Sequence, residues 1–292
     1  MENKTIKKKR TKTITLSVIG IALVLLVVWI AWGNNALELN SYSIASNSLP
    51  KEFDGFRIAQ VSDLHNAEMG KDNEKLISML ADADPDIIVI TGDMIDSRNT
   101  KVDVALSFAE QAVKIAPCYY VTGNHEARVD EYSDLKDGLI ELGVTVLEDA
   151  KTEMACSGES IVLVGVSDPS FQTDYLFGDD ETVLNSKLNE LISEENGYVI
   201  LLSHRPELFD TYVENKVDLI FSGHAHGGQF RIPFIGGVVA PNQGVFPKYD
   251  AGIYSEGDTN MVVSRGVGNS IIPFRINNHP EVILIELTTQ GE

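Results

Sequence analysis

Cysteine is scarce in this sequence, where Cys118 and Cys156 are the only two thiols among 292 residues. Two cysteines are too few for the disulfide framework that stabilises small secreted domains. At 43% hydrophobic residues the chain can instead bury one large core. Each cysteine lies beside apolar residues typical of strands, so we expect both to be buried as small hydrophobic side chains. The sequence does not decide whether they pair.

Basic residues are also few outside the N-terminus. The chain has 23 Lys and Arg against 43 Asp and Glu, a formal net charge of -20. Residues 1–12 carry six basic residues and one acidic residue, so subtracting that segment's +5 from -20 leaves -25 for the rest. A body this acidic repels a phosphate backbone and releases few counterions, which argues against a nucleic acid polymer as substrate or partner. Small phosphates and phosphates carried by lipids remain compatible with it.

A long uncharged run follows the basic N-terminus. Residues 14–32 form a stretch of 19 residues without a charged side chain, with Trp29 and Trp32 near its end. This length just spans a hydrocarbon core of roughly 30 Å, aromatic side chains favour the interface, and Lys and Arg stay on the cytoplasmic side. We therefore expect a basic cytoplasmic leader over residues 1–13 and a transmembrane helix or signal anchor over 14–32. The chain would cross the cell membrane once, with the rest of it outside the cytoplasm.

A cleaved signal peptide is the alternative interpretation, since Ala31-Trp32-Gly33 places small residues at a plausible cleavage spacing. The apolar run is longer than the usual signal-peptide core of roughly 7 to 15 residues, which favours an uncleaved anchor. No twin arginine precedes the run, so the sequence does not indicate the export route for folded proteins.

The rest of the chain divides into a short polar segment and one domain. Residues 33–52 are rich in Asn and Ser, which predicts an exposed linker. From residue 53 to 292, short apolar runs alternate with amphipathic stretches, beginning with 57–61 and 74–80. This alternation predicts an α/β domain. After Gly228 the pattern changes to short strands punctuated by Gly and Pro, and the sequence has no internal repeat.

Five of the six histidines lie in short motifs that also contain acids or amides. The motifs are Asp63-Leu64-His65, Gly92-Asp93-Met94-Ile95-Asp96, Gly123-Asn124-His125-Glu126, Ser203-His204 and Gly223-His224-Ala225-His226. The first polar residue of each motif comes at the carboxyl end of a predicted strand. Open α/β sheets bind ligands in the crevice at those ends, so five distant segments can converge on one site. Neutral imidazoles and carboxylates are common ligands of Zn, Fe and Mn, so the pattern predicts a two-metal hydrolytic site.

The spacing inside the motifs allows two metal ions. Asp63 and His65 are two residues apart, so both side chains can point to one side of an extended segment, and His224 and His226 repeat the arrangement. Each pair offers two ligands to one ion or one ligand to each of two ions. The second case suits ions roughly 3.5 to 4 Å apart with a bridging carboxylate, for which Asp93 is the candidate. A lone Asp or His after a strand is usually a turn residue, but five motifs that agree in type, order and position favour metal binding.

This ordered series resembles the calcineurin-like metallophosphoesterases over roughly Arg57 to Leu287. The segments at 227–233 and 264–268 are similar to the membrane-associated bacterial branch of that family. The resemblance implies a four-layer α/β/β/α sandwich over 53–292, preceded by the N-terminal transmembrane helix. It also implies two divalent metal ions, Mn, Zn or Fe. The first ion would be held by Asp63, His65, Asp93 and His226, and the second by Asp93, Asn124, His204 and His224.

The resemblance also assigns residues around the metals. His125 would not be a ligand; it would contact the phosphate and donate a proton to the leaving group, a role that suits an imidazole titrating near neutrality. Asp96 would orient His125, as a carboxylate often does for a histidine at a metal or phosphate site. Glu126 is a candidate for hydrogen bonding within the site loop. Asp168 is expected simply to begin a loop.

Three arginines and one apolar segment have two interpretations each. Arg205, Arg231 and Arg265 could grip a phosphate, but an arginine in an acidic protein is more often solvated or salt-bridged. We expect the solvated or salt-bridged state for Arg231 and leave Arg265 open. The segment 232–239 could dip toward a membrane and receive a lipid head group. A buried hairpin is the favoured expectation, because apolar residues bounded by Gly and Pro first suggest core strands.

A member of this family would hydrolyse phosphoesters. Relatives that are tethered or exported cleave phosphodiesters, so the resemblance implies a phosphodiesterase acting on a small or lipid-linked phosphodiester at the outer face of the membrane. A phosphomonoesterase is the alternative within the class. A non-catalytic envelope receptor that binds metal or phosphate is the alternative outside it. The presence of His125 with Asp96 favours an enzyme, because a receptor needs no proton donor.

Overall fold

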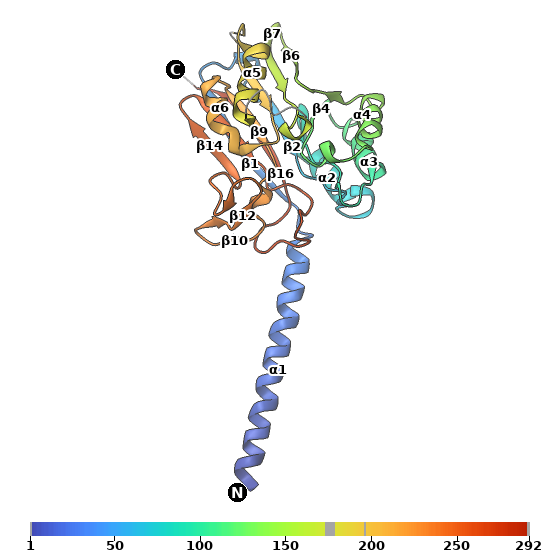
Figure 1. Ribbon diagram of the computed structural model, residues 1–292, viewed down its shortest axis with the longest axis vertical. Coiled ribbons are helices and arrows are strands. Elements are labelled where there is room, and N and C mark those ends of the chain that lie inside the picture. Colours follow the sequence, from blue (N-terminus) through green and yellow to red (C-terminus); the bar gives the residue numbers. More distant parts are fainter. Residues whose placement is uncertain (1, 173–178, 196, 291–292) are drawn as a thin grey trace.

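A long N-terminal helix and a folded body make up the chain (Figure 1). The structure is a computed structural model that describes residues 2–172, 179–195 and 197–290. Helix α1 (Glu2–Gly33) projects from the body, and its segment Lys12–Gly33 is long and apolar enough to cross a membrane. The apolar side chains of this segment are exposed rather than packed in a core. Such a surface suggests membrane anchoring, in line with the helix expected over 14–32.

Six strands form the first sheet. In spatial order they are β1 (Glu38–Ser46), β16 (Glu281–Thr289), β2 (Arg57–Val61), β3 (Ile87–Thr91), β4 (Cys118–Val121) and β5 (Thr145–Val146). Strands β2 to β5 are parallel, and β16 runs antiparallel to β2. The helices that follow β2, β3 and β4 are α2 (Glu74–Ala83), α3 (Val102–Ala112) and α4 (Tyr132–Glu141). Parallel neighbours need crossover connections of this kind.

Six further strands form the second sheet. In spatial order they are β14 (Gly252–Glu256), β15 (Thr259–Val263), β9 (Leu219–Ser222), β8 (Val199–Leu202), β7 (Glu159–Gly165) and β6 (Ala150–Cys156). The central strands β7, β8, β9 and β15 are parallel, whereas both edge strands are antiparallel to their neighbours. Helices α5 (Asp180–Ile192) and α6 (Phe209–Glu214) belong to this half. Short 3-10 turns lie at Lys51–Phe53, Lys71–Asn73, Glu126–Arg128, Pro169–Phe171, Pro206–Leu208 and His226–Gly228.

Three clusters of buried apolar side chains lie between the layers. Their positions confirm the α/β/β/α sandwich. Strand β3 shows how the layers arise. Its Ile88 and Ile90 pack in the cluster that includes residues of α2, α3 and α4, while Ile87 and Val89 lie in the cluster between the two sheets. Successive side chains of a strand point to opposite faces, so a strand covered on both faces is apolar throughout. The third cluster joins the second sheet to α5 and α6, for example through Leu188.

The folded body begins earlier than the sequence suggested. Within the predicted linker over 33–52, residues Glu38–Ser46 form β1, which pairs in parallel with β16 from Glu38 opposite Glu281 to Ser46 opposite Thr289. The expectation of an exposed linker was therefore wrong for this stretch. The physical reason is that β1 is an edge strand with mostly exposed side chains, so it can be polar and lacks the apolar run that marks a buried strand.

Two small hairpins precede β14. They pair β10 (Arg231–Ile232) with β11 (Gly236–Gly237) and β12 (Val239–Ala240) with β13 (Gly244–Val245). Figure 1 shows β10 and β12 on the side of the body from which α1 leaves. The expectation of a buried hairpin over 232–239 was wrong, because Phe234 at the first hairpin tip is fully exposed and Ile235 is 66% exposed. The sheets already bury their faces against each other and the helices, so these strands add no core layer.

Candidate functional site

The predicted metal ligands follow parallel strands of both sheets. Asp63 and Asp93 come two residues after β2 and β3, and Asn124 comes three residues after β4. His204 and His224 come two residues after β8 and β9 of the second sheet. All seven side chains expected to bind metal are buried: Asp63, His65, Asp93, Asn124, His204, His224 and His226. Carboxyl ends of strands thus place polar groups from distant segments at one location.

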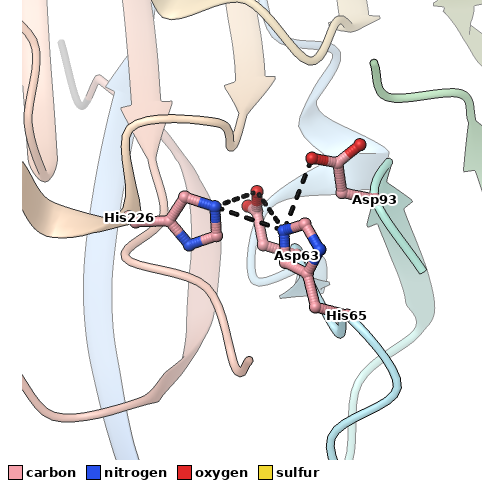
Figure 2. A group of neighbouring side chains, drawn as sticks. All are labelled: Asp63, His65, Asp93 and His226. Atoms are coloured by element: carbon pink, nitrogen blue, oxygen red, sulfur yellow. Dashed lines mark hydrogen bonds and ion pairs between the residues drawn. The ribbon is translucent and has the colours of Figure 1, made fainter. Parts of the chain in front are cut away.

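The first cluster consists of Asp63, His65, Asp93 and His226 (Figure 2). His65 Nε2 lies 3.4 Å from Asp93 Oδ2, 3.8 Å from Asp63 Oδ1 and 3.2 Å from His226 Nε2. His226 Nε2 lies 3.4 Å from Asp63 Oδ1. One ligand atom from each of the four residues falls within 4.8 Å of the others. Ligand atoms this close suit a single cation bound at distances of roughly 2.0–2.2 Å.

The second cluster shares Asp93 with the first. His204 Nε2 lies 3.3 Å from Asp93 Oδ2 and 3.2 Å from His224 Nδ1. The same Asp93 oxygen therefore faces a histidine of each cluster. Nearby, Asn124 Oδ1 is buried and has no hydrogen-bond partner among the described residues. A buried carbonyl oxygen without a donor suits a cation ligand, so the residues present fit a metal centre.

The backbone around the ligands is unusual. Five of the ligands have φ between 45° and 65°, in the left-handed region: Asp63, His65, Asp93, His224 and His226. Side chains with a Cβ rarely adopt this region, and such strain clusters at functional sites. Two glycines allow the close packing here. A Cβ at Gly123 would lie 2.3 Å from Asp93 Oδ1, and one at Gly223 would lie 2.4 Å from Asp63 Oδ2.

Hydrogen bonds to the backbone and to an amide orient two of the histidines. His204 Nδ1 lies 2.7 Å from Thr91 O, so Nδ1 donates there and Nε2 faces Asp93. His224 Nε2 lies 3.2 Å from Asn242 Oδ1 and 3.2 Å from Arg205 Nη1, and these contacts leave its Nδ1 facing His204 Nε2 at 3.2 Å. Contacts of this kind fix which nitrogen can bind a metal.

Burial and the neighbouring charges shift the pKa values of the candidate ligands. Burial raises the pKa of Asp63 to about 6, and repulsion from Asp93 adds to the effect. Burial opposes protonation of His204, but Asp93 and Asp63 outweigh it and raise the pKa of His204 to about 10. Burial keeps the pKa of His224 and His226 well below the usual range. His224 and His226 are therefore neutral, as metal binding requires, whereas a metal ion bound at His204 would have to displace its proton.

His125 lies beside the first cluster without joining it. Its backbone N–H donates to Asp93 Oδ1 at 2.8 Å, and its ring makes an edge contact with His65 at a centroid distance of 4.5 Å. Its Nδ1 accepts the Ser97 backbone N–H at 3.0 Å. Asp96 was expected to orient this ring, but its Oδ1 lies 3.6 Å from Nδ1. The Asp96 carboxylate instead accepts hydrogen bonds from Arg98 Nε at 2.9 Å and Arg98 Nη2 at 2.5 Å. The residue after Asp96 therefore makes the hydrogen bond that sets the ring's orientation.

Glu126 has a larger role than the sequence indicated. Its carboxylate is fully buried and accepts backbone N–H groups from Gly123 at 2.8 Å, Asp93 at 3.0 Å and Met94 at 2.8 Å. It thereby joins the loop after β3 to the loop after β4. Burial, with repulsion from Asp93, raises the pKa of Glu126 to about 8. The available signal was an acid inside the Gly-Asn-His-Glu motif, but sequence alone does not show that it is buried.

A buried ion pair beside the second cluster was also missed. Asp168, expected only to begin a loop, is buried and binds Arg205 through two oxygens, at 2.5 Å to Nε and 2.9 Å to Nη2. Arg205 Nη1 lies 3.2 Å from His224 Nε2. The guanidinium is thus held against a candidate ligand by a bidentate carboxylate, a geometry that fixes its orientation. An Asp and an Arg 37 residues apart carry no sequence signal that they pair.

The other two arginines serve structural ion pairs. Arg265 binds Glu281 at 2.7 Å and Glu38 at 2.9 Å, so it joins β1 and β16 to the loop after β15. Arg231 lies 3.1 Å from Asp250. The salt-bridged state expected for Arg231 is confirmed, and Arg265 has the same kind of role.

The chain also matches known proteins. The family model described as calcineurin-like phosphoesterase matches residues 56–228. The protein named Uncharacterized metallophosphoesterase YkuE of Bacillus subtilis (strain 168) is 30% identical over 259 residues, 86% of this chain and 85% of that protein. Phosphodiesterase YaeI of Escherichia coli (strain K12) is 28% identical over 247 residues, 80% of this chain and 82% of that protein.

Solved structures support the fold. The structure of the protein TT1561 of Thermus thermophilus matches with a TM-score of 0.50 and 15% identity, covering 73% of this chain and 90% of that one. At this identity the match bears on the fold alone. The family model, which spans more than half of the chain, and the Bacillus subtilis relative bear on the family. This chain belongs to the calcineurin-like metallophosphoesterases.

Proposed function

We propose that this chain is a binuclear-metal phosphodiesterase. The observation that carries the proposal is the position of Asp93, whose Oδ2 lies 3.4 Å from His65 Nε2 in one cluster and 3.3 Å from His204 Nε2 in the other. A carboxylate oxygen between two sets of ligands is the arrangement of two-metal hydrolytic sites. Phosphoester hydrolysis follows from the family. The binding of two metal ions and the preference for diesters are what we propose in addition.

The ligands divide between two divalent ions. Asp63, His65, Asp93 and His226 would hold the first ion, and Asp93, His204 and His224 the second. Asn124, whose buried Oδ1 has no hydrogen-bond partner among the described residues, would be a further ligand of the second ion. Mn, Zn and Fe all accept mixed imidazole and carboxylate ligands. Ions bound there would neutralise charge on the phosphoryl group and lower the pKa of water to produce a nucleophile.

The side chain of His125 would act on the phosphoester itself. Because Nδ1 accepts the Ser97 N–H, the neutral ring carries its hydrogen on Nε2 and can donate a hydrogen bond to a phosphoryl or leaving-group oxygen. Full transfer of that proton needs a second proton on Nδ1. That proton would replace the contact with the Ser97 N–H; Ser97 Oγ at 3.1 Å could accept it, while the Asp96 carboxylate at 3.6 Å would stabilise the positive charge of the ring. His125 thus serves as donor to the leaving group, with Ser97 and Asp96 as positioning residues.

The substrate would be a small or lipid-linked phosphodiester at the outer membrane face. Support for the bond type comes from the name of the Escherichia coli relative, Phosphodiesterase YaeI. Support for the location comes from α1 and from the basic residues that precede its apolar segment, because Lys and Arg flanks remain in the cytoplasm. The acidic body disfavours long nucleic acids as substrates.

Hydrolysis of matched chromogenic esters tests the proposal. The detergent-solubilised chain, stripped of metal and resupplied with Mn, Zn or Fe, is assayed on bis(p-nitrophenyl) phosphate and p-nitrophenyl phosphate. Metal-dependent cleavage that favours the diester is the expected result. A preference for the monoester would make the chain a phosphomonoesterase. If neither ester is hydrolysed although two metal ions are bound, a receptor or an enzyme with a narrow substrate range would be favoured.

A matched pair of variants tests the assignment of His125. His125→Ala should lower turnover strongly while metal content stays unchanged, because the side chain lies beside the ligands without being one. Asp96→Asn removes a charge that lies 3.6 Å from the ring but leaves the Ser97 hydrogen bond, so a smaller loss is expected. Wild-type rates for His125→Ala would show that the assigned mechanism is wrong.

A further inference from the structure

Exposed apolar side chains gather on the loops next to α1. We name as the apolar rim six residues of the hairpins β10 to β13 and of the loop before β16: Phe234, Ile235, Val245, Phe246, Ile271 and Phe274. Their exposure ranges from 39% for Phe274 to complete exposure for Phe234. The hairpins lie on the side of the body from which α1 leaves (Figure 1). Clustered exposure of large apolar side chains usually marks an interaction surface.

The charge of the same segments is unlike the rest of the chain. Residues 229–249 and 266–280 contain no Asp or Glu, although the whole chain has 43. Arg231, which pairs with Asp250, and Lys248 border a cavity of about 470 Å³ beside Phe234. The body is acidic overall, but these two segments carry no acidic residue of their own and present mainly apolar groups at this location. Such a surface tolerates phosphate head groups that would repel the remainder of the body.

Hydrogen bonds hold the rim in place relative to α1 and the metal ligands. Asn34, just past α1, donates to Arg275 O at 3.0 Å and accepts from Arg275 N at 2.8 Å. Gln229 Nε2 donates to Phe274 O at 2.6 Å, and Asn278 Nδ2 donates to His226 O at 2.8 Å. The loop over 266–280 thus contacts both the end of the membrane helix and the turn that carries a metal ligand.

A cavity lies at this junction. Its volume is about 580 Å³, and Val27, Ile30 and Ala31 of α1 line it together with Met69 and Phe274 of the body. Met69 belongs to the loop that follows His65. The cavity therefore lies between the membrane helix and a loop of the candidate site. The apolar part of its lining is suited to an acyl chain, while Glu68 and three asparagines line the rest.

We propose that the apolar rim inserts into the bilayer leaflet that faces the body and holds the metal-binding side chains at the level of the lipid head groups. The proposal rests on the proposed membrane anchoring by α1. Aromatic and branched side chains favour the boundary between head groups and acyl chains, so Phe234 and Phe246 enter it as wedges. The substrate class is then a phosphodiester within or just above that boundary, and the docked body reaches it without the lipid leaving the membrane.

Depth measurements on the full chain test the docking. Phe234→Cys in a Cys156→Ser background is labelled with an environment-sensitive fluorophore and reconstituted in vesicles of equal parts phosphatidylcholine and phosphatidylglycerol. Ile140→Cys is the matched control, since Ile140 is an apolar residue of α4 that is 52% exposed and outside the rim. Lipids with a nitroxide on the acyl chain should quench the label at 234 several-fold more than the label at 140.

Three outcomes would overturn the proposal. Equal quenching at both positions would show that the rim stays in water. A label at 234 whose emission changes with the number of protein chains per vesicle, and which the nitroxide lipid does not quench, would show that a second copy of the chain covers the rim. A chain that fails to float with the vesicles would contradict the membrane anchoring itself, which separates that failure from failure of the rim.

A kinetic experiment tests whether the rim is needed for hydrolysis of a substrate that is embedded in a membrane. Phe234→Asp with Phe246→Asp should lower hydrolysis of a vesicle-borne phospholipid with a p-nitrophenyl head group several-fold, while hydrolysis of soluble bis(p-nitrophenyl) phosphate stays unchanged. Ile140→Asp should change neither rate. Equal loss on both substrates would contradict the docking role. A parent chain inactive on both diesters would refute the proposed diesterase, while the depth measurement would still report on the rim.

Discussion

Replacement of Glu126 by alanine should destabilise the body through backbone groups rather than through lost packing. In Glu126→Ala, the N–H groups of Gly123, Asp93 and Met94 lose their acceptor in a region closed to water. Each buried donor left without a partner costs about 1–3 kcal/mol, so three at the low end cost about 3 kcal/mol. For a domain of this size, 1 kcal/mol corresponds to about 2–4 °C in Tm, which gives a fall of at least about 6 °C.

Thermal unfolding of the metal-free chain, followed by circular dichroism in detergent, measures this effect. Glu126→Gln keeps one acceptor oxygen and should fall between the parent and the alanine variant. Glu141→Ala, on the exposed face of α4, is the control and should stay within about 0.5 kcal/mol of the parent. A Glu126→Ala variant that melts within about 1 °C of the parent would refute the argument, because three orphaned donors cannot be accommodated at so small a cost.

Three other predictions concern the ligands, an ion pair and the cysteines. Asp93→Asn should lose most of its bound metal in elemental analysis, because one Asp93 oxygen faces both clusters; full retention would contradict the bridging role. Burial opposes ionisation of Asp168, but Arg205 outweighs it and lowers the pKa of Asp168, so the pair stabilises the fold at neutral pH and loses this contribution as pH falls through that lowered pKa. The stability gap between parent and Asp168→Asn in urea titrations should therefore be constant above about pH 5 and narrow as pH falls below it, and a gap that stays constant in acid would count against the ion pair. Burial raises the pKa of Cys118 to about 12, so iodoacetamide should modify only the partly exposed Cys156 before unfolding, as mass spectrometry can check.

Short-range patterns in the sequence predicted an α/β domain and placed the candidate ligands at strand ends, whereas the four-layer arrangement was implied by the resemblance to the family. Apolar runs such as 87–91 mark strands buried on both faces, and polar residues directly after them mark the strand ends. Asp63 and His224 illustrate this, since each lies two residues beyond its strand and both enter the site. Order and residue type then sufficed to identify the family.

Features that depend on pairing between distant segments were not predictable. The edge strand β1 is polar because only one of its sides is paired and its faces are mostly exposed, so its residues indicated a linker. The burial of Asp168 against Arg205 and of Glu126 beneath two loops arises from contacts across the fold. Cys156, expected to be buried, is only partly so, whereas Cys118 is buried as predicted, and both are free thiols in the part of the chain described.

The candidate ligands come from both sheets, which has a consequence for how activity develops as the chain folds. Asp63, Asp93 and Asn124 follow strands of the first sheet, and His204 and His224 follow strands of the second. Neither half of the sandwich carries a complete set, so an intermediate with one sheet formed cannot bind the ions as the native state does. If the ions bind as proposed, metal occupancy would report that the two halves have docked, and chelation would weaken the contact between the sheets before it affects either sheet alone. A newly synthesised chain would therefore be inactive until both sheets have folded and packed against each other.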